Sequence, residues 1–272
     1  MTDGPFLATL AGGPEDGARA MARDESLVRH LARTGAPAIV LRRHGWLRPT
    51  LSLGRGQALP EGLLEAAAAL AVEVVRRPTG GGWLLHLPGD LALTTALAGP
   101  LRSGDFRRAA RMTSQAIALG LAACGRPAIV FTGLTRPASR AEVCFQRADR
   151  DEVVLGSTKV AGVALARFGQ AALVQAALPL VPAPPELGVF AERWDAHRAA
   201  AAAESAGIER DALWRGTVDA LARIADLRAR AWHWPGPVLR DAEELRVRVY
   251  GDPATRGRHE AALPDHGAGG GR

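Results

Sequence analysis

The sequence predicts an α/β protein, with one large domain of strands and helices and a small appendage. Its 272 residues are 47% hydrophobic, which is enough to bury one sizeable core. Segments with the periodicity of strands and of helices also follow one another along the chain. We expect residues 1–182 to form the main domain, residues 183–250 a helical extension packed on it, and residues 251–272 a disordered tail.

The first half of the chain predicts alternating helices and strands. In order, these are a helix over 14–34, strands over 36–43 and 49–54, a helix over 59–70, a strand over 71–77, and a pair of strands up to about residue 97. The strand over 71–77, AVEVVRR, is rich in β-branched side chains. Pro78 ends it, because proline has no amide hydrogen to donate to a sheet.

The second half continues this pattern and then becomes helical. We expect a helix over 104–123, a strand over 127–132, a polar loop over 133–143, and two or three strands up to about residue 180. The sequence PAPPE at 182–186 interrupts the strands. Residues rich in Ala, Arg and Glu then predict two or three helices up to residue 230.

A glycine loop directly follows the strand at 71–77, in the sequence RRPTGGGWLLH from Arg76 to His86. Glycines 80, 81 and 82 have no Cβ, so they can adopt positive φ and turn backbone N–H groups toward an anion or a carboxyl-derived group. Arg76 and Arg77 would add rigid forks of donors. The alternative interpretation is an ordinary glycine hairpin without a ligand.

A lysine lies among small apolar residues in the segment DEVVLGSTKVAGVALAR, residues 151–167. This segment predicts two short strands around a Gly-Ser turn, and it places Lys159 among neighbours that should be buried. Because lysine is rarely buried without a partner, Lys159 with Gly162 three residues later indicates a charge directed at a ligand. A lysine whose ammonium extends to solvent from a strand end is the alternative.

Four segments of the chain resemble the lipoate–protein ligase and octanoyltransferase family, which shares its fold with the catalytic domain of biotin–protein ligases. They are MARDESLVRH at 21–30, LRPTLSLGRGQ at 47–57, RRPTGGGWLLHLPGDLALTTAL at 76–97 and CFQRADRDEVVLGSTKVAGVA at 144–164. They occur in the family's order and cover about two thirds of the chain. The resemblance implies a mixed β-sheet flanked by helices, with residues 1–182 as an acyl-binding catalytic domain and a small helical extension after it.

The resemblance also implies roles for individual residues. In the family, an arginine-glycine loop holds the acyl group or acyl-adenylate. The residues that match this loop here are Arg76, Arg77, Thr79 and glycines 80–82. The residue matching Lys159 contacts the reactive carbonyl, and Gly162 belongs to the same motif. His86 matches a family position where it would orient the loop or contact substrate. Asp90 and Thr94 are expected to support the neighbouring strand.

Cys144 decides between two reactions. Its place before Lys159 and next to Phe145 is similar to cysteine-dependent octanoyltransferases, in which this cysteine takes the acyl chain from acyl carrier protein without ATP. The basic residues Arg147, Arg150 and Lys159 would favour the thiolate. The alternative is an ATP-dependent lipoate ligase, using ATP and Mg, in which Cys144 is structural. Cys124, at a helix end before a glycine, is expected in the core.

Departures from the family leave a third interpretation open. Where family members carry a His-Gly pair, this chain has Gln175 and Ala176. After the lysine, where the family usually carries a small residue and a glutamine, it has Val163, Ala164 and Leu165. A non-catalytic protein that binds lipoyl domains or acyl chains is therefore an alternative. Biotin ligation fits less well, because the RRPTGGG context does not resemble the biotin-specific loop.

Composition limits the partners. The net charge of +6 and the pI near 10.6 predict an acidic partner, and lipoyl domains and acyl carrier protein are typically acidic. Nucleic acid is not expected, because aromatic residues are only 5% and no basic block is interleaved with rings. Two cysteines and scattered histidines predict no metal site. No apolar run suits a membrane helix and no leader is apparent, so we expect a cytoplasmic protein.

Overall fold

The computed structural model describes residues 4–58, 61–99, 105–133, 148–188, 190 and 196–252. The strands are β1 (Leu7–Glu15), β2 (Ile39–Trp46), β3 (Thr50–Leu53), β4 (Glu73–Arg76), β5 (Leu84–His86), β6 (Leu91–Leu97), β7 (Ile129–Val130), β8 (Val153–Leu155), β9 (Thr158–Phe168), β10 (Ala171–Leu178) and β11 (Ala229–Ala231). The helices are α1 (Gly17–Thr34), α2 (Leu63–Ala69), α3 (Asp105–Ala123), α5 (Ala196–Glu204), α6 (Arg210–Ala225), α7 (Gly236–Arg248) and the short 3₁₀ helix η1 (Pro185–Leu187).

The strands form two sheets. The large mixed sheet has eight strands in the order β11-β1-β2-β6-β10-β9-β8-β7, and the small sheet has the order β4-β3-β5. Strands β11, β1 and β2 are parallel, and the remaining neighbours in the large sheet are antiparallel. The expected α/β fold with a mixed sheet is therefore confirmed.

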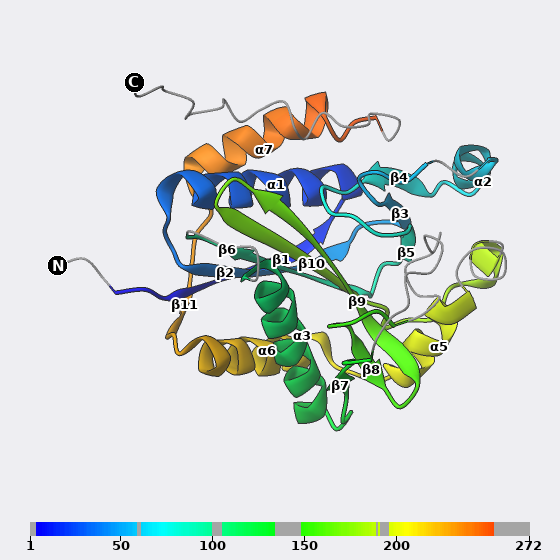
Figure 1. Ribbon diagram of the computed structural model, residues 1–272. Coiled ribbons are helices and arrows are strands. Elements are labelled where there is room, and N and C mark those ends of the chain that lie inside the picture. Colours follow the sequence, from blue (N-terminus) through cyan, green and yellow to red (C-terminus); the bar gives the residue numbers. More distant parts are fainter. Residues whose placement is uncertain are drawn as a thin grey trace, which may run out of the picture.

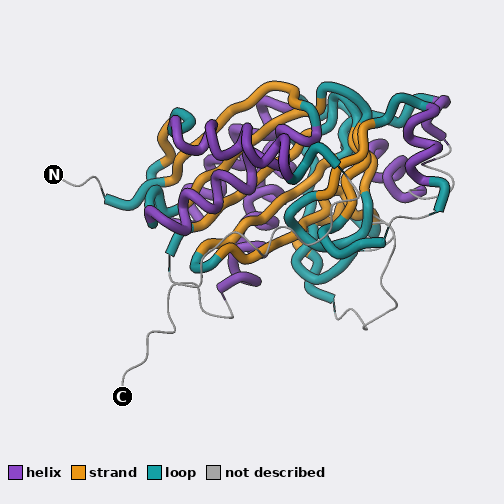
Figure 2. The backbone as a smooth tube through the Cα atoms, turned by 90° about the horizontal axis from the view of Figure 1, so that it is seen from above, coloured by secondary structure: helices purple, strands orange, loops and turns teal. Residues whose placement is uncertain are grey.

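Helices cover both faces of the large sheet. Helices α1 and α7 lie along each other on one face, and α3 and α6 lie on the opposite face (Figure 1). Seen from above, the two helices on the first face cross over the strands as a layer (Figure 2). Leu27, Val28 and Leu31 of α1 pack on the sheet in one apolar cluster, while Ile117 of α3 and Leu213 of α6 belong to another. The sheet is thus buried on both sides, as apolar runs such as IVL at the start of β2 require.

Two neighbouring strands at one end of the large sheet, β1 and β11, were not apparent from the sequence. Strand β1 contains Gly12, Gly13 and Pro14, which obscure a β pattern, and it ends where Asp16 caps α1 by accepting a hydrogen bond from Arg19 N at 2.8 Å. The expected helix over 14–34 therefore begins at Gly17. Strand β11 is a three-residue exposed strand that pairs with β1 across more than two hundred residues of sequence.

The segment expected as a helical extension joins both faces of the fold. Helix α6 packs against α3 and α7 against α1, and β11 adds a strand to the large sheet between them. Ser26 Oγ donates to Val238 O at 2.8 Å, and the hydroxyl of Tyr250 donates to the buried Glu25 carboxylate. The boundary at residue 182 stays a prediction, and the expected tail lies outside the described residues beyond Asp252.

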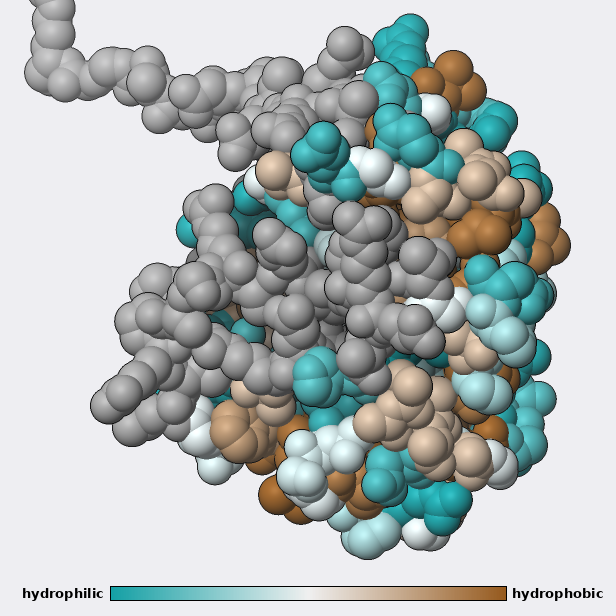
Figure 3. All heavy atoms as spheres, turned by 90° about the vertical axis from the view of Figure 1, so that its right-hand side faces the viewer, coloured by the Kyte–Doolittle hydropathy of each residue, from teal (hydrophilic) through white to brown (hydrophobic). Residues whose placement is uncertain are grey.

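The end of the molecule that carries α2 and α5 shows apolar and polar residues interspersed over its described part (Figure 3). None of the described helices is both long and apolar enough to cross a membrane. Among the described residues, no cluster of three or more His, Cys, Asp or Glu is suited to a metal ion.

Candidate active site

The small sheet holds the glycine loop between β4 and β5. Gly81 has a φ of +99°, in the positive range that only glycine adopts readily. Of the three loop glycines, Gly81 is the one with a positive φ of this kind. The loop folds against the turn after β3, where Arg55 N donates to Thr79 O at 2.8 Å. A Cβ on Gly54 would overlap the carbonyl oxygen of Gly81. The two turns therefore touch through backbone, and Gly54 is a requirement that sequence reasoning missed.

Both arginines of the loop are buried and donate to backbone oxygens. Arg77 reaches Ser52 O at 2.9 Å and the carbonyls of Gly80 and Gly82 at 2.7 Å each. Arg76 donates to Gly54 O and Gln57 O, each at 2.8 Å. These bonds fasten the glycine loop to the neighbouring turn. The ligand-binding role expected of both arginines stays a prediction.

A cavity opens beside the loop. Its wall is mainly apolar, and the residues that contribute apolar surface are Met21, Trp46, Leu84, Ala92, Leu93, Ala164, Ala176 and Ala177. Of the predicted site residues, the structure brings Arg77, His86 and Gly162 together in this wall. An apolar wall of this kind suits an acyl chain.

His86 forms part of an aromatic wall in this cavity. Its ring stacks on Trp46 at 3.9 Å between centroids, and its Nε2 lies 2.8 Å from Ser52 Oγ. Burial lowers the pKa of His86 well below 6.5, and the nearby Arg77 and Arg198 lower it further. A neutral imidazole held by Trp46 and Ser52 fits the expectation that His86 orients the loop or contacts substrate and does not act as an acid or base.

A buried polar network runs from the glycine loop to the centre of the sheet. Thr79 donates to Gln175 Oε1 at 2.8 Å, and Gln175 Nε2 donates to Asp24 Oδ2 at 2.7 Å. The other Asp24 oxygen pairs with the fully buried Arg42. Thr94 also donates to Asp24, at 2.8 Å. Gln175, which departs from the family pattern, is therefore the link between the loop and this ion pair.

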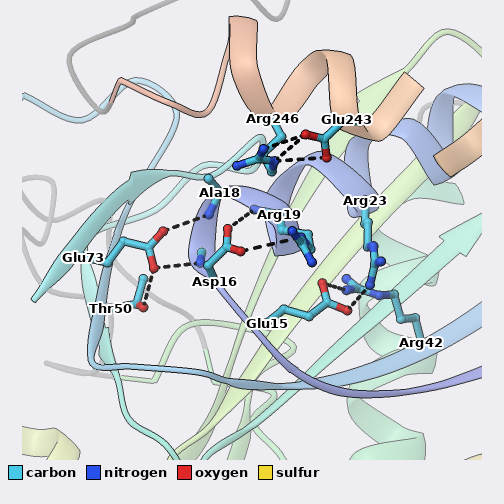
Figure 4. Close-up of polar contacts among 11 residues, drawn as sticks. Glu15, Asp16, Ala18, Arg19, Arg23, Arg42, Thr50, Glu73, Glu243 and Arg246 are labelled. Carbon is cyan, nitrogen blue, oxygen red and sulfur yellow. Dashed lines mark hydrogen bonds and ion pairs between the residues drawn. The ribbon is translucent and has the colours of Figure 1, made fainter. Parts of the chain in front are cut away.

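Carboxylates anchor the other end of this network and the small sheet (Figure 4). Glu15 lies between two arginines, 2.6 Å from Arg42 and 2.7 Å from Arg23. Glu73 of β4 accepts from the first amides of α1, Gly17 N at 2.9 Å and Ala18 N at 3.1 Å. In the sequence, Arg42 is marked by its charge on the otherwise apolar strand β2. No pattern of neighbouring residues identified its carboxylate partners.

Lys159 is buried, with 5% of its surface exposed, as its neighbours predicted. Its ammonium lies 2.7 Å from Glu152 Oε2. Glu152 also accepts from Asp149 N at 2.7 Å, and burial raises its pKa while Lys159 opposes the rise. Lys159 is not in the wall of the cavity, whereas Gly162 on the same strand is. Sequence reasoning missed Glu152, and the role of Lys159 stays a prediction.

Of the two cysteines, Cys124 lies within the described residues and Cys144 does not. Cys144 lies outside the described residues, as does Arg147, so the expected nucleophile remains a sequence prediction. Cys124 follows α3 and packs half-buried against the core cluster that includes Leu121. Burial raises the pKa of its thiol. Cys124 therefore packs at the margin of the core and not inside it.

The expectation for Asp90 also agrees with the structure. Its carboxylate accepts from Leu87 N at 2.8 Å and from Leu180 N at 2.9 Å, and it pairs with the buried Arg198 of α5 at 2.5 Å. Asp90 therefore ties together the residues that follow β5, the residues that follow β10, and α5.

Comparisons with known proteins agree with this geometry. Residues 16–205 match the model of the lipoyl protein ligase A/B catalytic domain. The chain is 35% identical over 168 residues to "Octanoyltransferase LipM" of Carboxydothermus hydrogenoformans, covering 60% of each protein, and 34% identical over 162 residues to that of Symbiobacterium thermophilum, covering 57% of each. The chain thus matches about three fifths of the length of these relatives.

Solved structures show the same fold. A putative lipoate protein ligase from T. acidophilum superimposes with a TM-score of 0.71 at 19% identity, covering 91% of this chain and 96% of that one. A lipoate-protein ligase A bound with ATP has a TM-score of 0.70 at 19% identity, covering 90% and 94%. With the family model spanning most of the folded sequence, the chain belongs to the lipoyl protein ligase A/B catalytic domain family.

Proposed function

We propose that this protein is an acyltransferase of protein lipoylation. It transfers an octanoyl or lipoyl group to a lysine of an acidic lipoyl domain, through a thioester on Cys144. The cavity next to the glycine loop is the observation that carries this proposal, because its wall of leucines, alanines and Trp46 suits an acyl chain. The relatives named as octanoyltransferases support the same reaction class.

The proposed reaction has two transfers. The Cys144 thiolate attacks the carbonyl of an acyl thioester, and the tetrahedral intermediate expels the donor's thiolate, which takes a proton from solvent. The amine of the lipoyl-domain lysine then attacks the acyl-cysteine. An amide forms, the Cys144 thiolate leaves, and the amine's proton passes to water. Lys159 and the amides of the glycine loop stabilise the developing oxyanion in both transfers.

The polar network positions the loop for this chemistry. Arg77 holds the carbonyls of Gly80 and Gly82, which fixes the orientation of the peptide groups between them. Thr79 is held from the other side by Gln175. A loop fixed before the substrate arrives loses little entropy on binding, which is what electrostatic stabilisation requires.

The net charge of +6 favours association with acidic carriers. Acyl carrier protein as donor and a lipoyl domain as acceptor both meet this condition. In the transferase reaction no further cofactor takes part, since the thioester already activates the acyl group.

An ATP-dependent lipoate ligase is the second candidate, with Cys144 in a structural role and Mg accompanying ATP. The fold favours it, because a neighbour with a TM-score of 0.70 is described as bound with ATP. A non-catalytic binding protein is the third. It is motivated by Gln175 and Ala176 in place of His-Gly and by the ion pair that engages Lys159.

Intact-protein mass spectrometry separates these functions. Incubated with octanoyl acyl carrier protein and no lipoyl domain, the wild type gains the mass of one octanoyl group. Cys144→Ser gains none, because a serine hydroxyl lacks an accessible anionic form near neutral pH. Cys124→Ser is the matched control and keeps the adduct. An octanoylated Cys144→Ser variant would contradict the thioester.

A parallel incubation with lipoate, ATP and a lipoyl domain tests the ligase. A lipoylated domain from this mixture alone, with Cys144→Ser fully active, replaces the transferase by the ligase. Absence of product in both mixtures, when a known family enzyme modifies the same domain, favours the binding protein.

A further inference from the structure

Two polar rings stand in the wall of the cavity beside the glycine loop. His44 and Trp46 of β2 both line this cavity, and each is only 2% exposed. Neither ring nitrogen of His44 has a hydrogen-bond partner among the described residues, and the indole Nε1 of Trp46 has none there either. The two rings lie edge to face, with their centroids 5.1 Å apart. Three buried polar atoms without partners therefore lie on neighbouring rings of one cavity wall.

The sheet register places these rings across the cavity from β9. His44 pairs with Ala92 of β6, and Ala92 pairs with Ala177 of β10. Ala177 pairs in turn with Gly162 of β9. All of these residues line the cavity, so the row crosses its floor over three strand spacings, about 14 Å in all. The residues between the two ends are alanines, which leave room for a chain above them.

This row fixes the direction in which an acyl chain would lie. Gly162 follows Lys159 by three residues on the same strand, and the proposed function places Lys159 at the reacting carbonyl. The carbonyl end of the chain therefore belongs at β9. The distal carbons of a chain lying along the row would then reach His44 and Trp46 on β2.

The imidazole of His44 can both donate and accept a hydrogen bond. Burial lowers the pKa of His44 well below 6.5, and the nearby Arg42 and Arg23 lower it further, so the ring is neutral. A neutral imidazole has one N–H and one bare nitrogen, and the indole of Trp46 adds a second donor. A plain hydrocarbon chain would leave all three atoms unpaired, which costs free energy.

We propose that His44 and Trp46 recognise a hydroxyl group in the distal half of the acyl chain. A hydroxyl matches this set of atoms, because its oxygen accepts from an N–H and its hydrogen donates to the bare imidazole nitrogen. The other histidine of the cavity, His86, already has Ser52 as a partner. The inference rests on the proposed function, since it uses the same cavity, and it adds hydroxylated acyl chains as a substrate class.

Calorimetry of the full-length chain with octanoate, 6-hydroxyoctanoate and 8-hydroxyoctanoate tests the proposal. At least one hydroxy acid should bind the wild type as tightly as octanoate or more tightly, because hydrogen bonds to the rings replace those that the hydroxyl loses to water. Without such partners, a buried hydroxyl should weaken binding about tenfold relative to octanoate. This comparison needs no variant.

His44→Phe removes both nitrogens and keeps a ring next to Trp46. Its affinity for the better hydroxy acid, divided by its affinity for octanoate, should fall about tenfold from the wild-type ratio. Damage to the fold would weaken both acids alike, so the ratio isolates the hydroxyl. Trp46→Phe removes one donor and should lower the same ratio a few-fold. His233→Phe, on the exposed segment between β11 and α7, is the matched control and should keep the wild-type ratio.

The outcomes separate this inference from the proposed function. A wild type that binds octanoate but binds both hydroxy acids at least tenfold more weakly overturns the inference and leaves the proposed function intact. An unchanged ratio in His44→Phe has the same consequence. Absence of binding by all three acids overturns the inference and the acyl-binding role of the cavity together.

Discussion

Arg77 and Lys159 are both buried cations that the sequence directs at a ligand, yet the fold holds them in different ways. Arg77 donates to the carbonyl oxygens of Ser52, Gly80 and Gly82, which carry no net charge. Lys159 lies 2.7 Å from the carboxylate of Glu152. The carbonyl oxygens around Arg77 cancel no charge, whereas the carboxylate partner cancels most of the field of Lys159. The β9 side of the site is therefore close to neutral while this ion pair persists.

Replacing Lys159 tests this contrast with the largest expected effect. Lys159→Met removes the ammonium and should lower acyl transfer by about two orders of magnitude or more. It also leaves Glu152 buried without its cation, which should reduce the free energy of unfolding by about 3 kcal/mol. Acyl-transfer rates and urea denaturation measure the two effects.

The double variant Lys159→Met with Glu152→Gln separates them. Because the buried negative charge is gone, stability should recover in large part while activity stays low. Recovery of both would assign Lys159 a purely structural role, and the two cations would then be alike.

The loop side is tested by Gly54. Gly54→Ala places a methyl group where the carbonyl of Gly81 lies, so the two turns must separate and acyl-ligand affinity should fall by about tenfold or more. Gly56→Ala is the matched control, because a Cβ there meets nothing within 4 Å. Calorimetry with octanoate or lipoate measures the affinity, and equal binding by both variants would show that this contact does not shape the site.

Gln175 tests whether the loop depends on the buried ion pair. Gln175→Ala breaks the link from Thr79 to Asp24 and should destabilise the fold by about 1 to 2 kcal/mol. Acyl-ligand affinity should fall by a few-fold, since the loop loses one of its supports. Gln170→Ala, in the exposed turn between β9 and β10, is the comparison. Thermal unfolding and calorimetry that do not distinguish the two variants would contradict the link.

The smallest expected effect concerns the charge state of His86. Its pKa in the folded protein lies well below the value of 6.5 for an unfolded chain, so below pH 6.5 the unfolded chain binds a proton that the folded one does not. Stability from His86 is therefore lost as pH falls. Between pH 7.5 and 5.5 the wild type should lose about 1 kcal/mol relative to His86→Gln.

Denaturation of both proteins at each pH measures this difference and cancels the effects of other titrating groups. A difference that does not change with pH would mean that the pKa of His86 is the same in the folded and the unfolded chain, so that the ring gains a proton in the fold near pH 6.5.

Local patterns in the sequence were sufficient for much of the fold. The β-branched run before Pro78, the glycine loop, the Gly-Ser turn before β9 and the break after β10 all depend on neighbouring residues, so each appears where it was expected. The burial of Lys159 also followed from its neighbours. The family resemblance carried the expectation of an acyl site, which no local pattern contains.

The sequence by itself therefore determined the α/β class, the position of the glycine loop and the burial of Lys159. Tertiary structure decided which partners these residues have. The pairing of β1 with β11, the link of Thr79 through Gln175 to Asp24, and the ion pair of Lys159 with Glu152 join groups that the sequence pattern does not connect. The physical reason is that periodicity reports how one segment buries its own side chains. A buried charge or amide, in contrast, must find its partner wherever the folded chain provides one.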